Sequence, residues 1–311
     1  MSMKKLILLI ATVFALQSAW SQEQSAVFTH YFINPILISP AVAGFNESHQ
    51  IHMNVRSQWT GFPESPKSYG IGYNGPIGKT LGLGVGVMSE NLGNMTNTRL
   101  QLNYAFRYEV KNVKFAAGFS TEFLTKKVAE SVMQSPLYDP DDNIIENAVD
   151  GNKVFDASLG AWATFKKNTF VGVTFPNLVV AKIGEIETGQ NEGSFLKYSI
   201  ITFGHEFEVE PYNFKLKPSV LVFNIKDKPL QIDFNMLGSF IDDKLLAGVS
   251  VRAGTGGATG IMLGTNVDVF RLYYSYDLTF QKFQKYNSGS HELTLLFSFD
   301  RGKKRYDRTP N

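Results

Sequence analysis

Residues 98–109 read Thr-Arg-Leu-Gln-Leu-Asn-Tyr-Ala-Phe-Arg-Tyr-Glu, and the two faces of this stretch differ sharply in polarity. One face carries Leu100, Leu102, Tyr104, Phe106 and Tyr108, and the other carries Arg99, Gln101, Asn103, Ala105 and Arg107. Side chains that alternate with a period of two are typical of a β-strand. The stretch therefore predicts a strand with an apolar environment on one side and water on the other.

The same alternation recurs along the chain and gives fourteen candidate strands. They span residues 51–59, 67–75, 80–88, 97–109, 113–124, 154–166, 168–175, 195–208, 212–223, 229–241, 243–252, 257–268, 270–280 and 291–299. Bacterial membrane barrels have even strand numbers and strands of about nine to eleven residues. The pattern favours an all-β fold, namely a transmembrane antiparallel up-and-down β-barrel of 14 strands.

The connections between these segments alternate in length. Short ones follow every second segment, at residues 76–79, 110–112, 166–168, 209–211, 242 and 269, whereas the others include long ones at 60–66, 89–96, 126–153, 176–194 and 281–290. A membrane barrel has short turns on one side and longer loops on the other. A soluble β-sandwich would suit the same composition, but it has no reason to segregate its loop lengths in this way.

Composition excludes several other classes of protein. The chain has 27 Gly, 25 Phe and 13 Tyr, with 19% charged residues and a net charge of +2. This charge balance gives no signal for polyanion binding, so nucleic acid is not an expected partner. The absence of cysteine argues against a disulfide framework and a lipidated amino terminus. No run of eighteen apolar residues occurs after the first 21, so we expect no membrane-spanning helix.

Four segments are expected along the chain. Residues 1–21 read as a signal peptide, with Lys4 and Lys5 before an apolar run and small residues near an expected cleavage site; an uncleaved anchor is the weaker alternative. Residues 22–50 alternate poorly and contain Pro35 and Pro40, so we expect a plug or periplasmic contact rather than a central strand. Residues 51–299 form the barrel, and residues 300–311 form a basic periplasmic tail.

Several stretches resemble the PorP/SprF family of type IX secretion system outer-membrane proteins. Residues 28–44 read Phe-Thr-His-Tyr-Phe-Ile-Asn-Pro-Ile-Leu-Ile-Ser-Pro-Ala-Val-Ala-Gly, and residues 56–62, 66–67, 217–219, 229–233, 248–252, 274–277 and 286–292 fit the family in order. At His30 and Val42 the residue differs from the residue type that is usual in the family. The residues that carry the resemblance include Asn34, Pro35, Pro40, Gly44, Trp59, Tyr286, Asn287, Ser288, Gly289, His291 and Glu292.

The resemblance implies a place in the bacterial outer membrane and a role in type IX secretion and gliding motility. The expected function is to bind a secreted adhesin through its C-terminal domain and to help export or anchor it. The expected partners are that domain, other type IX components and outer-membrane lipid, with no small-molecule substrate and no cofactor. One alternative is docking on the periplasmic type IX ring for general cargo export, and another is a passive solute channel. A surface enzyme is a third, weaker alternative.

Candidate catalytic and metal-binding residues are few. The histidines lie in no catalytic motif, so we expect solvated loop and rim positions for His30, His49, His52, His205 and His291. Asp139, Asp141 and Asp142 could offer oxygens to calcium, but the stretch lacks the glycine and closing glutamate of an EF-hand loop. A solvated acidic turn is the favoured interpretation, and we expect the protein not to be an enzyme.

Ten charged residues fall on the predicted inner face of the strands. A charged side chain on the lipid face would destabilise the protein by a few kcal/mol near the midplane of the membrane, so we expect these residues to face the lumen. There they either pair with one another, which we favour, or bind a guest. Their near balance of charge favours a plugged or network-filled interior over a porin ring. They are Arg99, Arg107, Glu122, Asp156, Lys215, Lys217, Asp233, Arg252, Arg271 and Asp277.

Overall fold

The computed structural model describes residues 28–134, 143–182, 198–209, 213–225, 229–254, 257–280 and 282–300. Several sequence predictions lie outside these ranges: the signal peptide at residues 1–21, the candidate calcium ligands Asp139, Asp141 and Asp142, and the basic tail beyond Asp300. Within the described ranges, no helix has the length and apolar character needed to cross a membrane.

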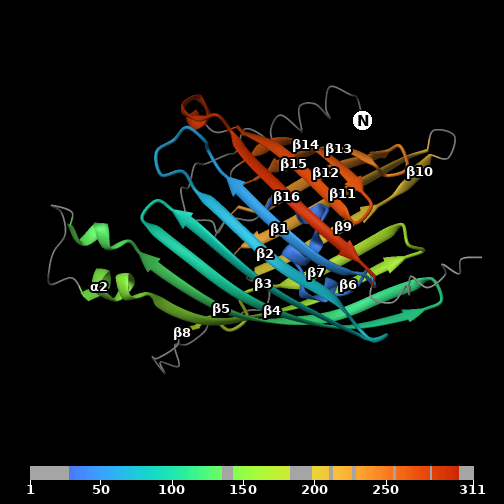
Figure 1. Cartoon of the computed structure of the whole chain (residues 1–311), viewed down its shortest axis with the longest axis horizontal. Helices are drawn as coiled ribbons and strands as arrows, with labels where there is room; N and C mark the ends of the chain where they lie inside the picture. The colour runs from blue at the N-terminus through green and yellow to red at the C-terminus, as the bar shows by residue number, and fades with distance from the viewer. Residues whose placement is uncertain are drawn as a thin grey trace, which may run out of the picture.

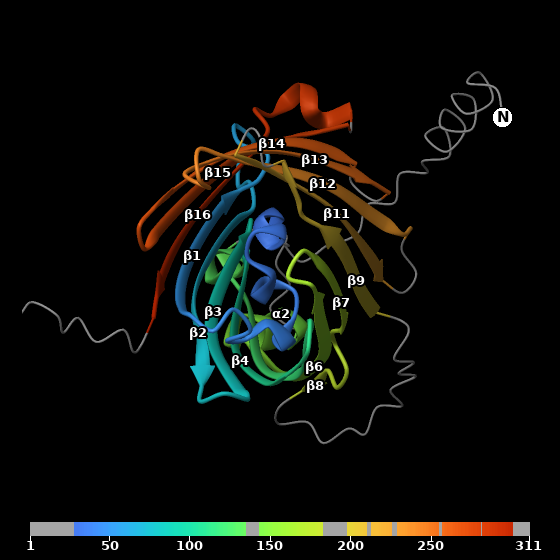
Figure 2. The ribbon, with the colours of Figure 1, turned by 90° about the vertical axis from the view of Figure 1, so that its right-hand side faces the viewer.

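In the described residues, sixteen strands form one antiparallel sheet. Fourteen of them close into a barrel because each pairs with the next along the chain and the last, β16, also pairs with the first, β1. Figures 1 and 2 show this closed wall. The predicted 14-stranded antiparallel barrel is confirmed. Its strands are β1 (His49–Ser57), β2 (Lys67–Ile77), β3 (Leu81–Leu92), β4 (Met95–Val110), β5 (Val113–Val128), β6 (Asn152–Phe165), β7 (Thr169–Phe175), β9 (Tyr198–His205), β11 (Phe214–Ile225), β12 (Gln231–Phe240), β13 (Leu245–Ala253), β14 (Ala258–Val267), β15 (Phe270–Thr279) and β16 (Ser290–Phe299).

Two short strands extend this wall. β8 (Ala181–Lys182) pairs with β6, and β10 (Phe207–Val209) pairs with β11. β9 and β10 share one register on β11, since Gly204 lies opposite Ser219 and Phe207 opposite Leu216. Pro218 falls in the gap between these pairs, and its missing N–H interrupts the ladder there. β9 and β10 are thus one strand with a break opposite a proline.

The structure corrects one predicted loop, residues 89–96. β3 continues to Leu92 and β4 begins at Met95, so only Gly93 and Asn94 connect them. β4 and β5 each have 16 residues and β6 has 14, more than the roughly nine to eleven that cross the hydrocarbon. Their ends project beyond the wall together with η4 (Glu130–Gln134) and α2 (Asn143–Asp150), on the left of Figure 1. Alternation of polarity fades in such a projecting hairpin because both of its faces meet water.

The two ends of the barrel differ in their connections. At one end, here termed the short-turn end, β1 begins and β16 ends, and five connections are short: residues 78–80, 111–112, 166–168, 241–244 and 268–269. At the opposite end, the long-loop end, β1 and β2 are joined by residues 58–66, and β15 and β16 by residues 280–289. This segregation of loop lengths agrees with the sequence prediction except at the β3–β4 connection, which lies at the long-loop end but has only two residues.

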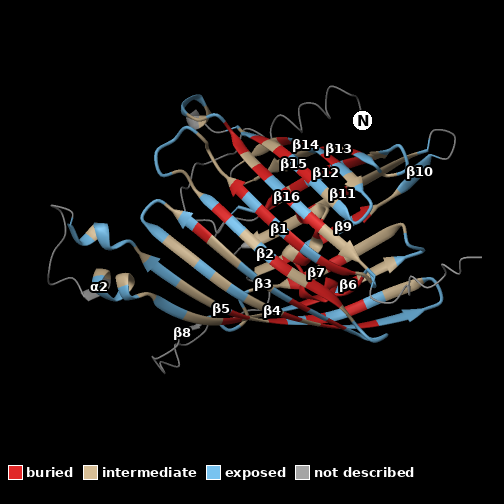
Figure 3. Ribbon diagram, viewed as in Figure 1, coloured by how far each residue is buried: buried red, intermediate tan, exposed pale blue. Residues whose placement is uncertain are grey.

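Apolar side chains form the outer surface of the wall. On β14, Ile261 and Leu263 are 60% and 61% exposed, whereas Met262 between them is 3% exposed. On β1, the inward positions are polar and buried, as His52, Asn54 and Arg56 illustrate. Figure 3 shows the resulting alternation of buried and exposed blocks along the strands. Such a surface matches lipid outside and a polar interior.

Residues 28–48, here termed the lumen segment, lie inside the barrel (Figure 2). Its three 3-10 helices are η1 (Thr29–Phe32), η2 (Pro35–Leu37) and η3 (Pro40–Val42). Pro35 and Pro40 begin η2 and η3, where a missing N–H costs no helical bond. Phe28 lies beside Gly70 in the long-loop half, and Gly44 lies beside Gly75 near the short-turn end. The segment therefore spans much of the length of the lumen.

Inward glycines let the lumen segment approach the wall closely. A Cβ on Gly82 would overlap the carbonyl of Ala43, and one on Gly118 would lie 2.6 Å from the Cα of Ala41. Gly44 itself has φ +62°, and its own Cβ would come within 2.6 Å of the Gly75 oxygen. Gly82 on β3 and Gly118 on β5 therefore allow close backbone contact with the lumen segment.

Alanine substitution at two glycines of β3 tests this packing. We expect Gly82→Ala to destabilise the protein by about 1–3 kcal/mol, because its methyl group collides with the lumen segment. Gly86→Ala is the matched control, since its Cβ would meet the Ile71 oxygen at an ordinary 3.7 Å. Urea unfolding and protease sensitivity of residues 28–48 measure the effect. Equal behaviour of the two variants would contradict the close approach.

Candidate functional site

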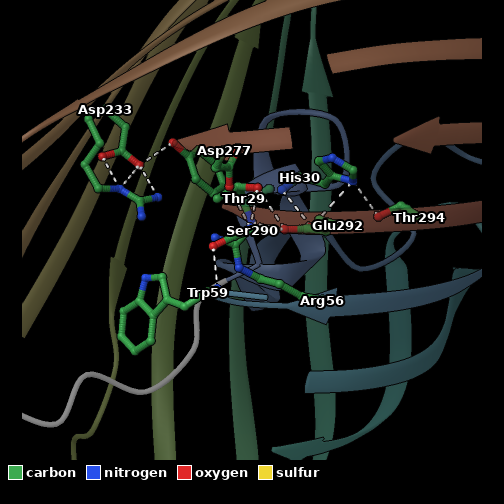
Figure 4. A network of polar contacts seen from close by, with 11 residues as sticks. Thr29, His30, Arg56, Trp59, Asp233, Asp277, Ser290, Glu292 and Thr294 are labelled. Atoms are coloured by element: carbon green, nitrogen blue, oxygen red, sulfur yellow. Dashed lines mark hydrogen bonds and ion pairs between the residues drawn. The ribbon is translucent and has the colours of Figure 1, made fainter. Parts of the chain in front are cut away.

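The carboxylate of Glu292 on β16 binds the start of the lumen segment. It accepts hydrogen bonds from the backbone N–H groups of Thr29 (2.7 Å) and His30 (3.1 Å), and from the Thr29 hydroxyl (2.8 Å). Arg56 on β1 adds a fourth donor, with Nη1 at 2.9 Å. Figure 4 shows these groups converging from β1, β16 and η1. Glu292 is 1% exposed, so water supplies little of this stabilisation.

Arg56 joins two carboxylates in the same network. Its Nη1 lies 2.9 Å from Asp277 on β15 as well as 2.9 Å from Glu292, and it also donates to the Thr29 hydroxyl at 3.0 Å. Arg56 is 5% exposed. A buried charge is tolerated only when it is paired and hydrogen-bonded. One guanidinium and two backbone N–H groups together offset the two carboxylates here.

His30 completes this end of the network through its ring nitrogen Nδ1. Its Nδ1 lies 2.7 Å from the Thr294 hydroxyl, which also accepts a hydrogen bond from Asn54 Nδ2 at 2.6 Å. Burial lowers the pKa of His30 below its usual value, although the nearby Glu292 opposes this shift. In the described part of the chain, no group of three or more His, Cys, Asp or Glu side chains could hold a metal ion.

Tyr31 links the lumen segment to a second ion pair in the wall. Its hydroxyl donates to Asp233 Oδ2 at 2.9 Å and accepts from Asn235 Nδ2 at 3.1 Å. Arg252 binds the same carboxylate through two nitrogens, Nε at 3.1 Å from Oδ1 and Nη2 at 3.0 Å from Oδ2. This bidentate geometry is the stronger form of an arginine–carboxylate contact. β12 and β13 therefore provide a second attachment point for η1.

Separate contacts hold the other end of the lumen segment at the short-turn end. Arg107 on β4 donates from Nη1 to the Gly44 oxygen at 2.6 Å, and from Nη2 to the oxygens of Gly78 and Leu81, both at 3.1 Å. Glu47 pairs with Lys114 at 2.5 Å, and this contact lowers the pKa of Glu47. The segment is thus attached to the wall at both ends.

The remaining predicted lumen residues also share the inward faces of their strands, and most have local partners. Arg99 lies 3.5 Å from Glu122, which also accepts a hydrogen bond from Ser120. Asp156 accepts from the backbone N–H groups of Ala157, Val179 and Val180. Lys215 pairs with Asp243 at 2.5 Å, and Arg271 contacts Tyr273. Lys217 has neither a hydrogen bond nor an ion pair among the residues that the structure describes.

The motif residues of the two distant family stretches meet at the long-loop end. Thr60 N donates to the Gly289 oxygen at 2.8 Å, Ser288 N donates to the Thr60 oxygen at 2.7 Å, and Trp59 N donates to the Ser290 hydroxyl at 3.2 Å. These bonds join the β1–β2 loop to the β15–β16 loop, and we term residues 58–66 and 282–289 the loop clasp. Asn34, Pro35, Pro40 and Gly44 all lie in the lumen segment below it, and Glu292 connects the two regions.

Two parts of this arrangement differ from the sequence prediction. His30, His49 and His52 are buried, so the expectation of solvated histidines is wrong for them. The reason is that they point into a lumen that protein fills rather than water. Arg56 and Tyr31 were not among the predicted site residues. The sequence does contain a signal for Arg56. It follows the same alternation as His52 and Asn54, opposite Ile51, Met53 and Val55, and this pattern predicts that Arg56 points inward.

Comparison with known proteins agrees with this fold. The family model described as "Type IX secretion system membrane protein PorP/SprF" matches residues 20–297. The Pseudomonas putida toluene transporter TodX is similar in structure, with a TM-score of 0.50 and 9% identity over 88% of this chain and 94% of that chain. Acinetobacter baumannii Omp33 gives a TM-score of 0.48 and 9% identity over 81% and 99%. No curated protein matches the sequence. The likeness to TodX supports the barrel fold alone.

Removing the carboxylate charge of Glu292 tests the attachment of η1. We expect Glu292→Gln to destabilise the protein by about 3–5 kcal/mol, because it leaves Arg56 partly uncompensated in a buried site. Urea unfolding and protease cleavage within residues 28–48 measure the change. The matched control is Glu109→Gln on β4, whose carboxylate is exposed and should leave the unfolding midpoint unchanged. A small effect at Glu292 equal to that at Glu109 would refute the anchoring role.

Proposed function

The chain belongs to the type IX secretion system membrane protein family PorP/SprF, and from this we propose that it binds the C-terminal domain of a secreted adhesin at the outer membrane and helps to export or anchor that adhesin. Its barrel fold and family place it in the bacterial outer membrane. We attribute no catalytic step to it. The observation that carries the proposal is a lumen filled by residues 28–48, beneath an exposed loop clasp.

The filled lumen supports a binding role over a passive solute channel. The lumen segment is held by ion pairs and hydrogen bonds at both ends, and its apolar residues Ile36, Ala41 and Val42 pack against the wall. A channel would need a continuous aqueous path past these contacts. A partner of this barrel is therefore expected to act on its ends rather than to pass freely through it.

The long-loop end offers the surface that suits a protein partner. In bacterial membrane barrels the longer loops face outward from the cell. The loop clasp exposes Phe62 and Tyr286, at 51% and 75% of their surface. The hydrogen bonds between the two loops hold these side chains on a braced support, and aromatic residues are frequent energetic centres of protein interfaces. The projecting ends of β4–β6 border the same end of the barrel.

Docking on the periplasmic ring is the second candidate, and one observation favours it. The short-turn end exposes Lys111, Lys166 and Lys167 in its tight turns. These three lysines suit an acidic periplasmic partner, whereas Asp242 and Asp268 are exposed in other turns of the same end. In this alternative, loss of the protein would stop the export of all type IX cargo rather than of one adhesin.

Paired substitutions at the two ends distinguish these candidates. We expect Phe62→Ser with Tyr286→Ser to reduce surface display of one adhesin at least tenfold, because two exposed aromatic contacts are removed. The matched control is Ile241→Ser, which removes an apolar side chain that is 62% exposed at the short-turn end. Adhesin on intact cells and total secreted cargo are quantified together. Loss of display only in the Ile241 variant, or loss of all cargo, would support the ring candidate instead.

Electrical recording tests the channel alternative directly. Because residues 28–48 occupy the lumen, the purified protein is expected to leave a planar lipid bilayer electrically quiet. A known open porin, purified and added to the bilayer in the same way, serves as the control for insertion. A large, steady conductance from the wild-type protein would overturn the closed lumen and favour solute transport.

A further inference from the structure

A cavity of about 190 Å³ lies between the lumen segment and the wall formed by β6, β7, β9 and β11. Figure 2 shows these strands facing the lumen segment across the interior. Its lining includes the exposed residues Asn46 and Lys167, so it reaches the surface at the short-turn end. For comparison, a cavity of about 150 Å³ in another protein holds a benzene molecule. The cavity is therefore large enough for a compact apolar group and a few further atoms.

One side of this cavity is aromatic. Trp162 on β6 and Phe170 on β7 stack with ring centroids 5.4 Å apart and planes inclined by 9°. The Lys217 Nζ lies 5.0 Å from the centre of the Phe170 ring. The hydroxyl-bearing side chains of Thr164, Thr202 and Ser219 also line the space. Apolar surface with a few polar groups is the usual character of a site for a small organic group.

Lys217 is the one predicted lumen charge that the described residues leave without a hydrogen bond or an ion pair. By the register of β9 and β10 on β11, Glu206 lies opposite it and lines the same cavity; the Glu206 charge acts on Lys217, but the two form no ion pair. With Lys167 at the rim, the cavity holds two cations and one carboxylate. The half-buried ammonium group of Lys217, beside an aromatic wall, would be stabilised most by an anion that binds in the cavity.

We propose that this cavity binds a carboxylate joined to a compact apolar body, with the carboxylate at Lys217 and the apolar body against Trp162 and Phe170. The source is either the free C-terminus of a polypeptide that ends in an apolar residue or a small organic acid of the same chemistry. The site faces the periplasmic side, at the opposite end from the loop clasp, so it is independent of the proposed adhesin contact.

Calorimetric titration of the full protein in lipid nanodiscs tests the site, with 3-phenylpropionate as the probe. We expect the acid to bind at least tenfold more tightly than the neutral 3-phenylpropanamide, since only the acid pairs with an ammonium. Lys217→Met should abolish this preference, and Glu206→Gln should strengthen binding of the acid. Lys215→Met is the matched control, because Lys215 shares the inward face of β11 but pairs with Asp243 outside the cavity.

The possible outcomes distinguish the two candidate ligands and include results that would overturn the proposal. Tighter binding of N-acetyl-phenylalanine than of 3-phenylpropionate would indicate a polypeptide terminus, and weaker binding would indicate a small acid. Absence of binding at millimolar probe, equal binding of acid and amide, or an equal loss in the Lys215 and Lys217 variants would overturn the proposal. Circular dichroism checks that each variant keeps the barrel. The Phe62 and Tyr286 variants should bind the probe normally, so failure here leaves the adhesin proposal untouched.

Discussion

A polar interior enclosed by an apolar band is the constraint on which this structure depends. Lipid outside requires residues such as Ile51 and Val55 to point outward, and the pleat of the strand then forces Asn54 and Arg56 inward. Inside a narrow lumen these groups need partners, because an unpaired buried charge is costly. The lumen segment supplies them, with the backbone N–H groups of Thr29 and His30 bound to Glu292.

This constraint also explains why the two ends of the barrel differ. At the long-loop end, Arg56 and Glu292 on β1 and β16 join the strand pair that closes the barrel to the lumen segment, and the loop clasp lies directly above that seam. At the short-turn end, Arg107 binds backbone oxygens instead, and both lysines and aspartates are exposed in the turns. The two ends thus present different surfaces, with exposed aromatic side chains in the loop clasp and exposed charges of both signs in the short turns.

Lys217 differs from the other inward charges for a structural reason. Most of those charges have a partner on a neighbouring strand or on the lumen segment. Lys217 instead lies next to Pro218, where the β9–β10 strand breaks, and faces a cavity rather than the lumen segment. Lys217 has no ion pair among the residues that the structure describes, and the carboxylate ligand proposed above would supply one.

The sequence by itself determined the fold class, the strand count and the inward position of the charged residues, because alternation and segment length are local properties of the chain. It failed at the β3–β4 hairpin, whose projecting ends meet water on both faces, and at the histidines, which lie in a lumen that is filled. Only the tertiary structure decided which groups meet. Thr29 and Glu292 are 263 positions apart, and their contact exists only because the barrel closes around the lumen segment.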